Sequence, residues 1–184
     1  IDAEIRGTGD HDVADLLGKM PEEKSDAILQ KMQTEESEEV EHLLRYGDDT
    51  AGGIMVPEFI ALSQEMTARE AIESLQTEHQ DVEMPFYLYV TDEHDCLKGV
   101  LSLRQLVVVT PNTPLKEFMT TEVISVQPGV DQEEVAKMVA RYDILAVPVV
   151  DETRHLVGIV TVDDVIDIFR QEATEDILKM AGAG

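Results

Sequence analysis

The sequence GIVTVDD at residues 158–164 decides the fold of this chain, because a related sequence, GVLSL, occurs at residues 99–103, which is 59 positions earlier. Both stretches begin at a glycine, continue with apolar residues and reach a hydroxyl residue just ahead of a helical pattern. Crowded apolar residues of this kind are typical of strands in a sheet that is covered by helices. The pair therefore predicts one structural unit that occurs twice.

A second pair of segments extends this duplication toward the N-terminus. Residues 55–62, MVPEFIAL, match residues 119–126, MTTEVISV, at a separation of 64. Because the separation falls to 59 further along, the first copy carries about five extra residues, which we place near residues 81–85. A duplicated unit of about 60 residues is too long for a solenoid repeat. We expect two similar lobes that are related by a pseudo-two-fold axis.

Each copy opens its first helix with a capping signal. Thr67 is followed by Glu70 in the first copy, and Asp131 is followed by Glu134 in the second copy. An N-cap oxygen with a glutamate at the third helical position is the pattern of a capping box. Each copy is thus predicted to run strand, capped helix, strand, turn, strand and helix.

Helical patterns flank the two copies. Residues 1–46 predict short helices, with Val13, Leu16 and Met20 on the apolar face of one of them. Three glycines and two aspartates at residues 46–53 predict a loop at a boundary between domains. From Val162 onward, the spacing of apolar residues predicts one long helix.

Composition narrows the class of protein. The chain has 184 residues, of which 43% are hydrophobic, and this is enough for a sizeable core. A formal net charge of −25 disfavours binding to nucleic acid or to anionic membranes and suits cations or basic partners. Cys96 is the single cysteine, so an intramolecular disulfide cannot form and a reducing compartment is expected. No apolar run is long enough to span a membrane, and the chain reads as an excised piece of a longer protein.

The duplicated unit resembles a known regulatory repeat. Residues 158–164, with the preceding strand at 146–151, are similar to the motif of cystathionine-β-synthase (CBS) repeats. Residues 46–55, 141–143 and 172–177 are similar to the cytosolic regulatory region of the MgtE family of magnesium transporters, which is a partial N domain plus a CBS pair. The resemblance implies an α+β fold: a tandem CBS pair of two βαββα lobes, preceded by a short all-α segment and followed by a long helix.

The resemblance also implies a division of the chain into five regions. These are the C-terminal part of a helical MgtE-type N domain at residues 1–46, a linker at 47–54, the first CBS repeat at 55–111, the second CBS repeat at 119–171, and the start of a connecting helix to a membrane domain at 172–184.

In the MgtE family the CBS pair regulates a magnesium pore. The resemblance implies a homodimer that binds regulatory Mg²⁺ at acidic interfaces and closes the pore of its own transmembrane domain when intracellular Mg²⁺ is high. The parent would be a multi-pass membrane protein, and this piece would be soluble at the cytoplasmic face of the cell membrane. We expect no enzyme and no catalytic substrate, because the sequence has no Walker loop, His-Glu-x-x-His or Gly-x-Ser-x-Gly motif.

Carboxylates are the ligands that a magnesium sensor requires, because Mg²⁺ prefers oxygen ligands. The acids that match Mg²⁺-binding positions of the family are Asp131, Glu133, Asp143, Asp164, Asp167, Glu172, Glu175 and Asp176. Further candidates in the N-terminal segment are Asp10, Asp12 and Asp15. The alternative interpretation is a solvated acidic helix face, with Asp131 serving only as an N-cap.

Adenine nucleotides are the alternative ligand, because CBS pairs commonly bind them. The resemblance implies nucleotide-binding roles for Tyr87, Ser102, Arg104 and Thr161. Gln105 stands where the first repeat of the family has the aspartate that binds ribose, and a neutral amide lacks the charge-assisted acceptor. We therefore expect ATP binding to be weak or absent.

Overall fold

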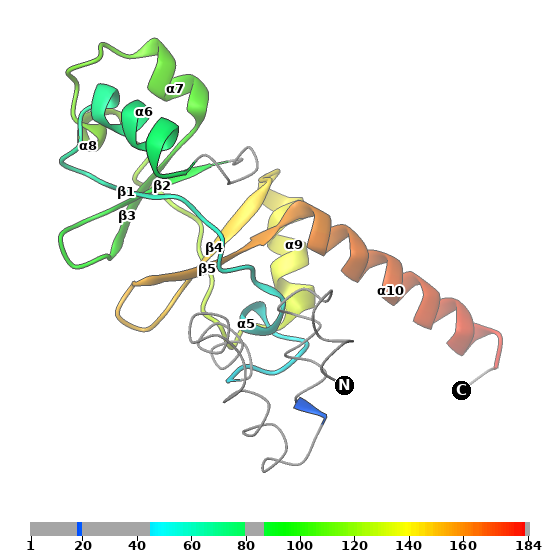
Figure 1. Cartoon of the computed structure of the whole chain (residues 1–184). Coiled ribbons are helices and arrows are strands. Elements are labelled where there is room, and N and C mark those ends of the chain that lie inside the picture. Colours follow the sequence, from blue (N-terminus) through cyan, green and yellow to red (C-terminus); the bar gives the residue numbers. More distant parts are fainter. Residues whose placement is uncertain (1–17, 20–44, 80–86, 183–184) are drawn as a thin grey trace, which may run out of the picture.

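Figure 1 shows the computed structural model, which describes residues 18–19, 45–79 and 87–182. Two lobes follow one another along the chain, and a long helix extends from the second lobe to the C-terminal end. The predicted α+β fold with a CBS pair and a long final helix is confirmed. Among the described residues, no helix combines the length and the apolar character needed to cross a membrane.

Several predictions fall on residues outside this description. They concern the short helices within residues 1–46, the acids Asp10, Asp12 and Asp15, and the extra residues near 81–85.

Three strands and two helices form the body of the first lobe. Strand β1 (Ala61–Ser63) pairs in parallel with β2 (Leu88–Thr91), and β2 pairs antiparallel with β3 (Leu97–Leu101). Helix α6 (Ala68–Thr77) connects the parallel strands, and α7 (Leu103–Val108) follows β3. Apolar side chains from the strands and both helices meet in one buried core.

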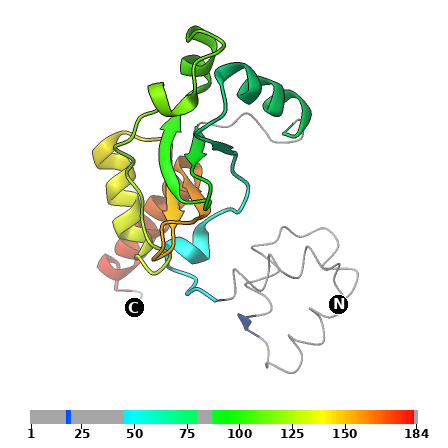
Figure 2. The ribbon, with the colours of Figure 1, turned by 90° about the vertical axis from the view of Figure 1, so that its left-hand side faces the viewer.

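The second lobe repeats this order with a longer last helix. Helix α9 (Gln132–Tyr142) precedes the antiparallel pair β4 (Ala146–Val150) and β5 (Leu156–Thr161), and α10 (Val162–Met180) follows. Figure 2 shows α9 and α10 side by side on this lobe. Valines from the strands and helices form most of its buried core.

Among the described residues, the second lobe does not form the full first strand that the duplication predicts. This strand is reduced to a single parallel bridge between Val126 and Val149. In the first lobe the N–H of Gln64 extends the ladder by donating to the Thr91 carbonyl at 2.9 Å. The equivalent position of the second lobe is Pro128, which has no N–H to donate. The strand pairing therefore ends earlier in the second lobe.

Both predicted N-caps are present, and two further caps emerge. Thr67 and Glu70 form the expected reciprocal box at the start of α6. Asp131 caps α9 by accepting from the Glu133 N–H at 2.8 Å, and the return bond expected from Glu134 is not formed in this described helix. Reciprocal capping boxes also open α7 and α10, and they are made by Ser102 with Gln105 and by Thr161 with Asp164.

The two lobes exchange their leading helices. Helix α5 (Ala51–Ile54) precedes the first repeat, yet the Ala51 side chain lies in the core of the second lobe. The backbone N–H of Ala51 also donates to the Val130 carbonyl at 2.7 Å. Helix α8 (Leu115–Phe118) precedes the second repeat, yet Leu115 lies in the core of the first lobe. The stretch expected as a linker at residues 47–54 thus contains a helix that belongs to the second lobe.

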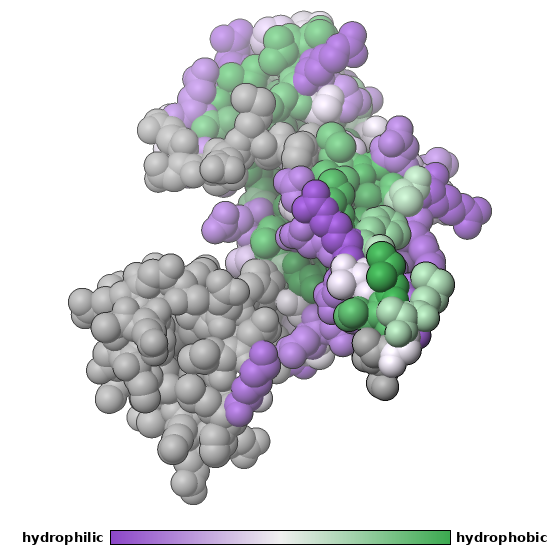
Figure 3. All heavy atoms as spheres, turned by 90° about the vertical axis from the view of Figure 1, so that its right-hand side faces the viewer, coloured by the Kyte–Doolittle hydropathy of each residue, from purple (hydrophilic) through white to green (hydrophobic). Residues whose placement is uncertain are grey.

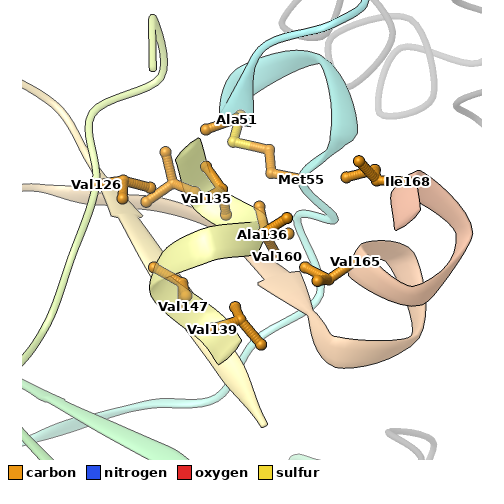
Figure 4. Packing of buried hydrophobic residues seen from close by; sticks show 11 residues of the cluster. Ala51, Met55, Val126, Val135, Ala136, Val139, Val147, Val160, Val165 and Ile168 are labelled. Atoms are coloured by element: carbon orange, nitrogen blue, oxygen red, sulfur yellow. The ribbon is translucent and has the colours of Figure 1, made fainter. Parts of the chain in front are cut away.

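The residue after each exchanged helix is a methionine whose side chain packs closely against a glycine of the other repeat. Met55 packs at Gly158 of β5, and Met119 packs at Gly99 of β3. An added Cβ would lie 2.6 Å from the Met55 sulfur at Gly158 and 2.5 Å from the Met119 sulfur at Gly99. Figure 4 shows Met55 among the buried residues that α5 and α10 bring to the core of the second lobe. The glycine at the start of each GVLSL or GIVTV stretch is therefore required for this close approach.

The two lobes also meet through their hairpins. The Leu97 N–H of β3 donates to the Arg154 carbonyl at 2.9 Å, and Cys96 forms a bridge with His155. Tyr89, Leu97 and Val150 form a buried apolar cluster between the two sheets. The pseudo-two-fold arrangement therefore rests on reciprocal helix exchange and on a shared apolar seam.

Gly158→Ala is expected to lower the free energy of unfolding by about 1–3 kcal/mol, because the added methyl overpacks Met55, which is 1% exposed. Urea unfolding followed by circular dichroism measures this change. Gly129→Ala is the matched control, because a Cβ there meets no atom within 4 Å. Equal stability of the two variants would contradict the packing role assigned to Gly158.

Candidate functional site

Helices α9 and α10 carry all eight predicted magnesium ligands, either within them or at their ends. The helices run antiparallel, because the Val162 N–H at the start of α10 donates at 2.8 Å to the carbonyl of Leu145, just past the end of α9. Val135 and Val139 of α9 pack with Val165 of α10 in the core. The apolar faces are thereby buried together, which leaves the acids along the outer sides.

The antiparallel packing sorts the eight acids into two groups. The proximal acidic group lies where α9 ends and α10 begins, and it comprises Asp143, Asp164 and Asp167. The distal acidic group lies at the start of α9 and on the later turns of α10, and it comprises Asp131, Glu133, Glu172, Glu175 and Asp176. Eleven helical residues separate the two ends of α9, which is about 16 Å at 1.5 Å per residue.

Glu172 is the acid of the distal group whose pKa is shifted by its surroundings. Its Oε1 atom is buried without a hydrogen-bond partner. Burial, followed by the negative charge of Glu133, raises the pKa of Glu172 above its ordinary value, and Lys137 offsets part of this effect. The Lys137 Nζ atom lies 3.9 Å from Glu133 Oε2. Two carboxylates from different helices are thus held close together with one ammonium group beside them.

The other distal acids are exposed or engaged in helix capping. Asp131 uses one carboxylate oxygen to accept the Glu133 N–H at the N-terminus of α9. Glu175 accepts a hydrogen bond from the Gln171 amide at 3.4 Å on the exposed face of α10. Asp176 is exposed and contributes negative charge to the surroundings of Glu172.

In the proximal group, two acids have local structural roles. Asp143 ends α9 in the left-handed conformation, with φ of 53°. Asp164 accepts from the Thr161 hydroxyl at 2.9 Å in the capping box of α10. Asp167 is exposed, and its carboxylate lies 3.8 Å from the Arg170 guanidinium.

No three His, Cys, Asp or Glu side chains are gathered closely enough to hold a metal ion within residues 18–19, 45–79 and 87–182. Glu133 and Glu172 are the two predicted ligands from different elements whose charges interact directly. A site of three or more ligands would therefore need a further surface next to one of the acidic groups.

The predicted nucleotide ligands lie at one end of the two sheets. Tyr87 precedes β2 and Ser102 follows β3, and these are neighbouring positions because Leu88 pairs with Leu101. The Tyr87 hydroxyl accepts the Leu145 N–H at 3.3 Å, so this ring reaches the second lobe just before β4. Thr161 lies at the same place, because Ala146 of β4 pairs with it.

The hydroxyl at the end of β3 is already engaged. The Ser102 N–H donates to Gln105 Oε1 at 2.9 Å, and the Gln105 N–H donates to Ser102 Oγ at 3.2 Å. Gln105 therefore takes the place of an acidic residue in a complete capping box. Its Oε1 atom accepts a hydrogen bond from the protein backbone rather than from a ligand. Arg104 lies on the first turn of α7.

Sequence reasoning missed two features of this region. Leu145 contributes its backbone N–H to Tyr87, and nothing in its side chain indicates this role. Tyr89 is 1% exposed, and its hydroxyl has no hydrogen-bond partner. Burial, followed by the neighbouring Tyr87, raises the pKa of Tyr89 far above its ordinary value.

Two family models match the chain. The CBS domain matches residues 51–111 and 115–171, and the MgtE intracellular N domain matches residues 9–49. The CBS matches begin at α5 and α8, four residues ahead of the predicted starts at 55 and 119.

Known magnesium transporters are similar to the chain. It is 51% identical over 142 residues to the magnesium transporter MgtE of Thermus thermophilus, and the match covers 77% of this chain and 32% of that protein. The match spans about a third of the length of this protein and of the two other magnesium transporters that the chain resembles.

Solved structures show the same similarity. A crystal structure of the soluble part of a magnesium transporter matches with a TM-score of 0.80 and 41% identity, and the match covers 89% of this chain and 64% of that chain. The cytosolic domain of the Mg²⁺ channel MgtE in complex with ATP matches with a TM-score of 0.79 and 43% identity, covering 88% and 66%.

The fold and these matches define a CBS-pair protein, and the chain belongs to the CBS domain family. Its CBS pair is preceded by residues that match the MgtE intracellular N domain. The resemblance to the regulatory region of MgtE-type magnesium transporters is confirmed.

Glu172→Gln is expected to raise the thermal unfolding midpoint at pH 7 in EDTA. Because the pKa of Glu172 is raised in the folded chain, folding disfavours the charged carboxylate, and this penalty is present above the folded-state pKa. The penalty disappears as the pH falls through that pKa, since the folded carboxyl then binds a proton. The gain from Glu172→Gln should therefore shrink between pH 7 and about pH 4.5, near the ordinary range of glutamate.

Glu175→Gln on the exposed face of the same helix is the control, and its effect should not follow this pH dependence. A gain from Glu172→Gln that is the same at both pH values would show that the raised pKa of Glu172 has no part in the stability of the α9–α10 packing.

Proposed function

We propose that this chain is the Mg²⁺-sensing regulatory part of a magnesium transporter or channel and that it closes the pore when intracellular Mg²⁺ is high. The observation that carries the proposal is the division of eight acids into two groups on α9 and α10, with no group of three potential ligands complete among the described residues. Mg²⁺ binding would thus bring two surfaces together, which is what a switch requires. The similarity to magnesium transporters supports this role.

A second copy of the chain is the partner that this arrangement favours. Apolar side chains stay exposed along α10, and they are Ile166, Phe169, Ile177, Leu178 and Met180. Figure 3 shows apolar and hydrophilic residues side by side where α10 points toward the viewer. An apolar stripe of this kind indicates an interaction surface, and a homodimer with two-fold symmetry would bury it.

Electrostatics provides the physical basis for the switch. Two copies would bring together two formal charges of −25, and like charges a few ångströms apart repel by about 1 kcal/mol or more even when partly solvated. A divalent ion between carboxylates converts this repulsion into attraction. It shifts the equilibrium toward the closed arrangement only by its difference in affinity for the two states. One site at a hundred times its Kd supplies about 2.7 kcal/mol, so several weak sites suffice.

In this proposal the chain works at the cytoplasmic face of the cell membrane, as the soluble regulatory part of a multi-pass protein. Its second partner is the transmembrane pore domain, which would follow α10. Residues 172–184 would connect the two parts, because α10 continues to Met180 without a break. We assign no catalytic step to the chain, and the similar magnesium transporters support this.

Mg²⁺ is expected to reduce the radius of gyration of the chain in small-angle scattering, whereas Na⁺ at matched ionic strength should not. Neutralising three acids of α10 together, by Asp164→Asn, Asp167→Asn and Glu175→Gln, should weaken this response, because the bridging carboxylates lose their charge.

The matched control removes three exposed acids from the first lobe, by Glu58→Gln, Glu73→Gln and Glu93→Gln. This control changes the net charge equally and should leave the response to Mg²⁺ intact. If the radius is the same in Mg²⁺ and in EDTA, the acids form only a solvated surface and the sensing role is refuted.

ATP is the second candidate ligand, and the ATP complex of a similar cytosolic domain supports it. Tyr87, Ser102 and Thr161 lie at one end of the two sheets, which is a suitable place for a nucleotide. Binding here should be weak, because Gln105 is neutral and already accepts from the Ser102 N–H. ATP would then modulate the magnesium response rather than serve as a substrate.

Isothermal titration calorimetry with ATP is expected to show weak or undetectable binding to the wild-type chain. Gln105→Asp should strengthen binding, because a carboxylate is a charge-assisted acceptor for ribose hydroxyls. Gln171→Asp, the same substitution on the exposed face of α10, should leave binding unchanged. Tight binding by the wild type would overturn this expectation.

A further inference from the structure

Two tyrosines at the start of strand β2 face the second lobe, and their hydroxyls differ in what they bond to. Leu88 and Val90 lie in the core of the first lobe, so Tyr87 and Tyr89 lie on the opposite face of the sheet. The Tyr87 hydroxyl accepts the Leu145 N–H of the second lobe at 3.3 Å. The Tyr89 hydroxyl is buried, and no hydrogen-bond partner reaches it among the described residues.

Tyr89 lies in an apolar seam between the lobes, which we define as the buried cluster of Tyr89, Leu97 and Val150. Tyr89 is 1% exposed and Leu97 is 2% exposed. The hydrophobic residues that pack around this cluster are Phe59, Tyr87, Val100, Val123, Leu156 and Ile159. A hydroxyl that leaves water without gaining a partner costs free energy, whereas the aromatic ring gains from burial. The seam therefore combines favourable packing of the ring with an unfavourable buried hydroxyl.

The repeat itself does not require a hydroxyl at this position. At the separation of 59, the equivalent residue of the second repeat is Pro148, which is buried and has no hydrogen-bonding side chain. Burial, followed by the neighbouring Tyr87, raises the pKa of Tyr89 far above its ordinary value, so the hydroxyl stays neutral near pH 7. The cost of burying it is therefore the loss of hydrogen bonds with water and not the burial of a charge.

Backbone amides beside the seam differ in which lobe accepts their hydrogen bonds. The Leu97 N–H of β3 donates across the seam to the Arg154 carbonyl at 2.9 Å. The Val150 N–H of β4 donates within the second lobe to the Val126 carbonyl, also at 2.9 Å. The Leu97 amide therefore reports separation of the lobes, whereas the Val150 amide reports opening of the second lobe itself.

From this packing we infer that Tyr89 makes the seam a conformational switch, because its hydroxyl favours parting of the two sheets at the seam while each lobe stays folded. The hydroxyl has no partner when the seam is closed, and it bonds to water when the seam opens. Helices α5 and α8 keep the repeats connected, since each is held in the core of the lobe it joins. This opening requires neither Mg²⁺ nor a nucleotide, so it does not rest on the proposed function. A ligand that contacts both lobes can shift such an equilibrium by its difference in affinity for the two states.

Hydrogen exchange of backbone amides, followed by NMR on the full chain in EDTA, tests the inference. In the wild type, the Leu97 N–H should exchange about tenfold or more faster than the Val150 N–H, relative to their rates in an unfolded chain, because the seam opens without unfolding of the second lobe. Tyr89→Phe should slow exchange at Leu97 by about tenfold and raise the thermal unfolding midpoint, because the closed seam then contains no unpaired hydroxyl.

Two matched substitutions control for the loss of a tyrosine hydroxyl. Tyr142→Phe removes a hydroxyl from a ring of α9 that is 47% exposed, and it should change neither the exchange at Leu97 nor the midpoint. Tyr87→Phe removes the acceptor of the Leu145 N–H, so it should accelerate exchange at Leu145 and should not raise the midpoint. The same substitution at positions 87 and 89 thereby compares a paired hydroxyl with an unpaired one.

Three results would overturn the inference. Equal protection of the Leu97 and Val150 amides in the wild type would show that the lobes part only when the chain unfolds. Unchanged exchange at Leu97 in Tyr89→Phe would show that the hydroxyl has no effect on the seam. A lower unfolding midpoint of Tyr89→Phe would show that the hydroxyl is bonded in the folded chain.

Discussion

The rest of this structure depends on one constraint, the close approach of a methionine to a glycine, which occurs once in each lobe. Met55 lies on Gly158 and Met119 on Gly99, so each lobe is completed by the segment that precedes the other repeat. The backbone bonds of Val56 with Ile159 and of Thr120 with Val100 follow from this contact. Neither lobe has a complete core without the exchanged helix, so the two repeats are packed as one unit rather than as two linked domains.

This unit determines where the charges lie. The buried valines of α9 and α10 bring the two helices together in antiparallel orientation, and the acids remain outside in two groups separated by about the length of α9. The charged form of the partly buried Glu172 is disfavoured by desolvation and then by the neighbouring Glu133, so these two effects oppose part of the stability gained from apolar packing. In the proposed function, a cation such as Mg²⁺ that neutralises these carboxylates would remove this opposition.

The candidate site could be predicted in part. The residue types and the resemblance predict eight acids as magnesium ligands, because Mg²⁺ prefers oxygen ligands, and their role stays a prediction. Nothing in the spacing indicated that Glu133 would face Glu172, since 39 positions separate them and their proximity depends on how α9 packs on α10. The contact of Tyr87 with Leu145 was also beyond prediction, because it joins the two lobes through a backbone N–H that carries no signal of its own.

The sequence by itself determined the duplication, the capped helices and the family, because these depend on local patterns: apolar spacing, N-cap residues and the GVLSL and GIVTV stretches. Only the tertiary structure decided which lobe each leading helix joins. The glycines at positions 52 and 53 led to the prediction of a linker, because glycine is also common in flexible loops. Their actual role depends on Tyr46 and Gly47 folding back over α5, and on α5 packing against a lobe that begins some 70 residues later in the chain. Contacts between residues so distant in sequence are set by the closure of the whole fold, which a local pattern does not encode.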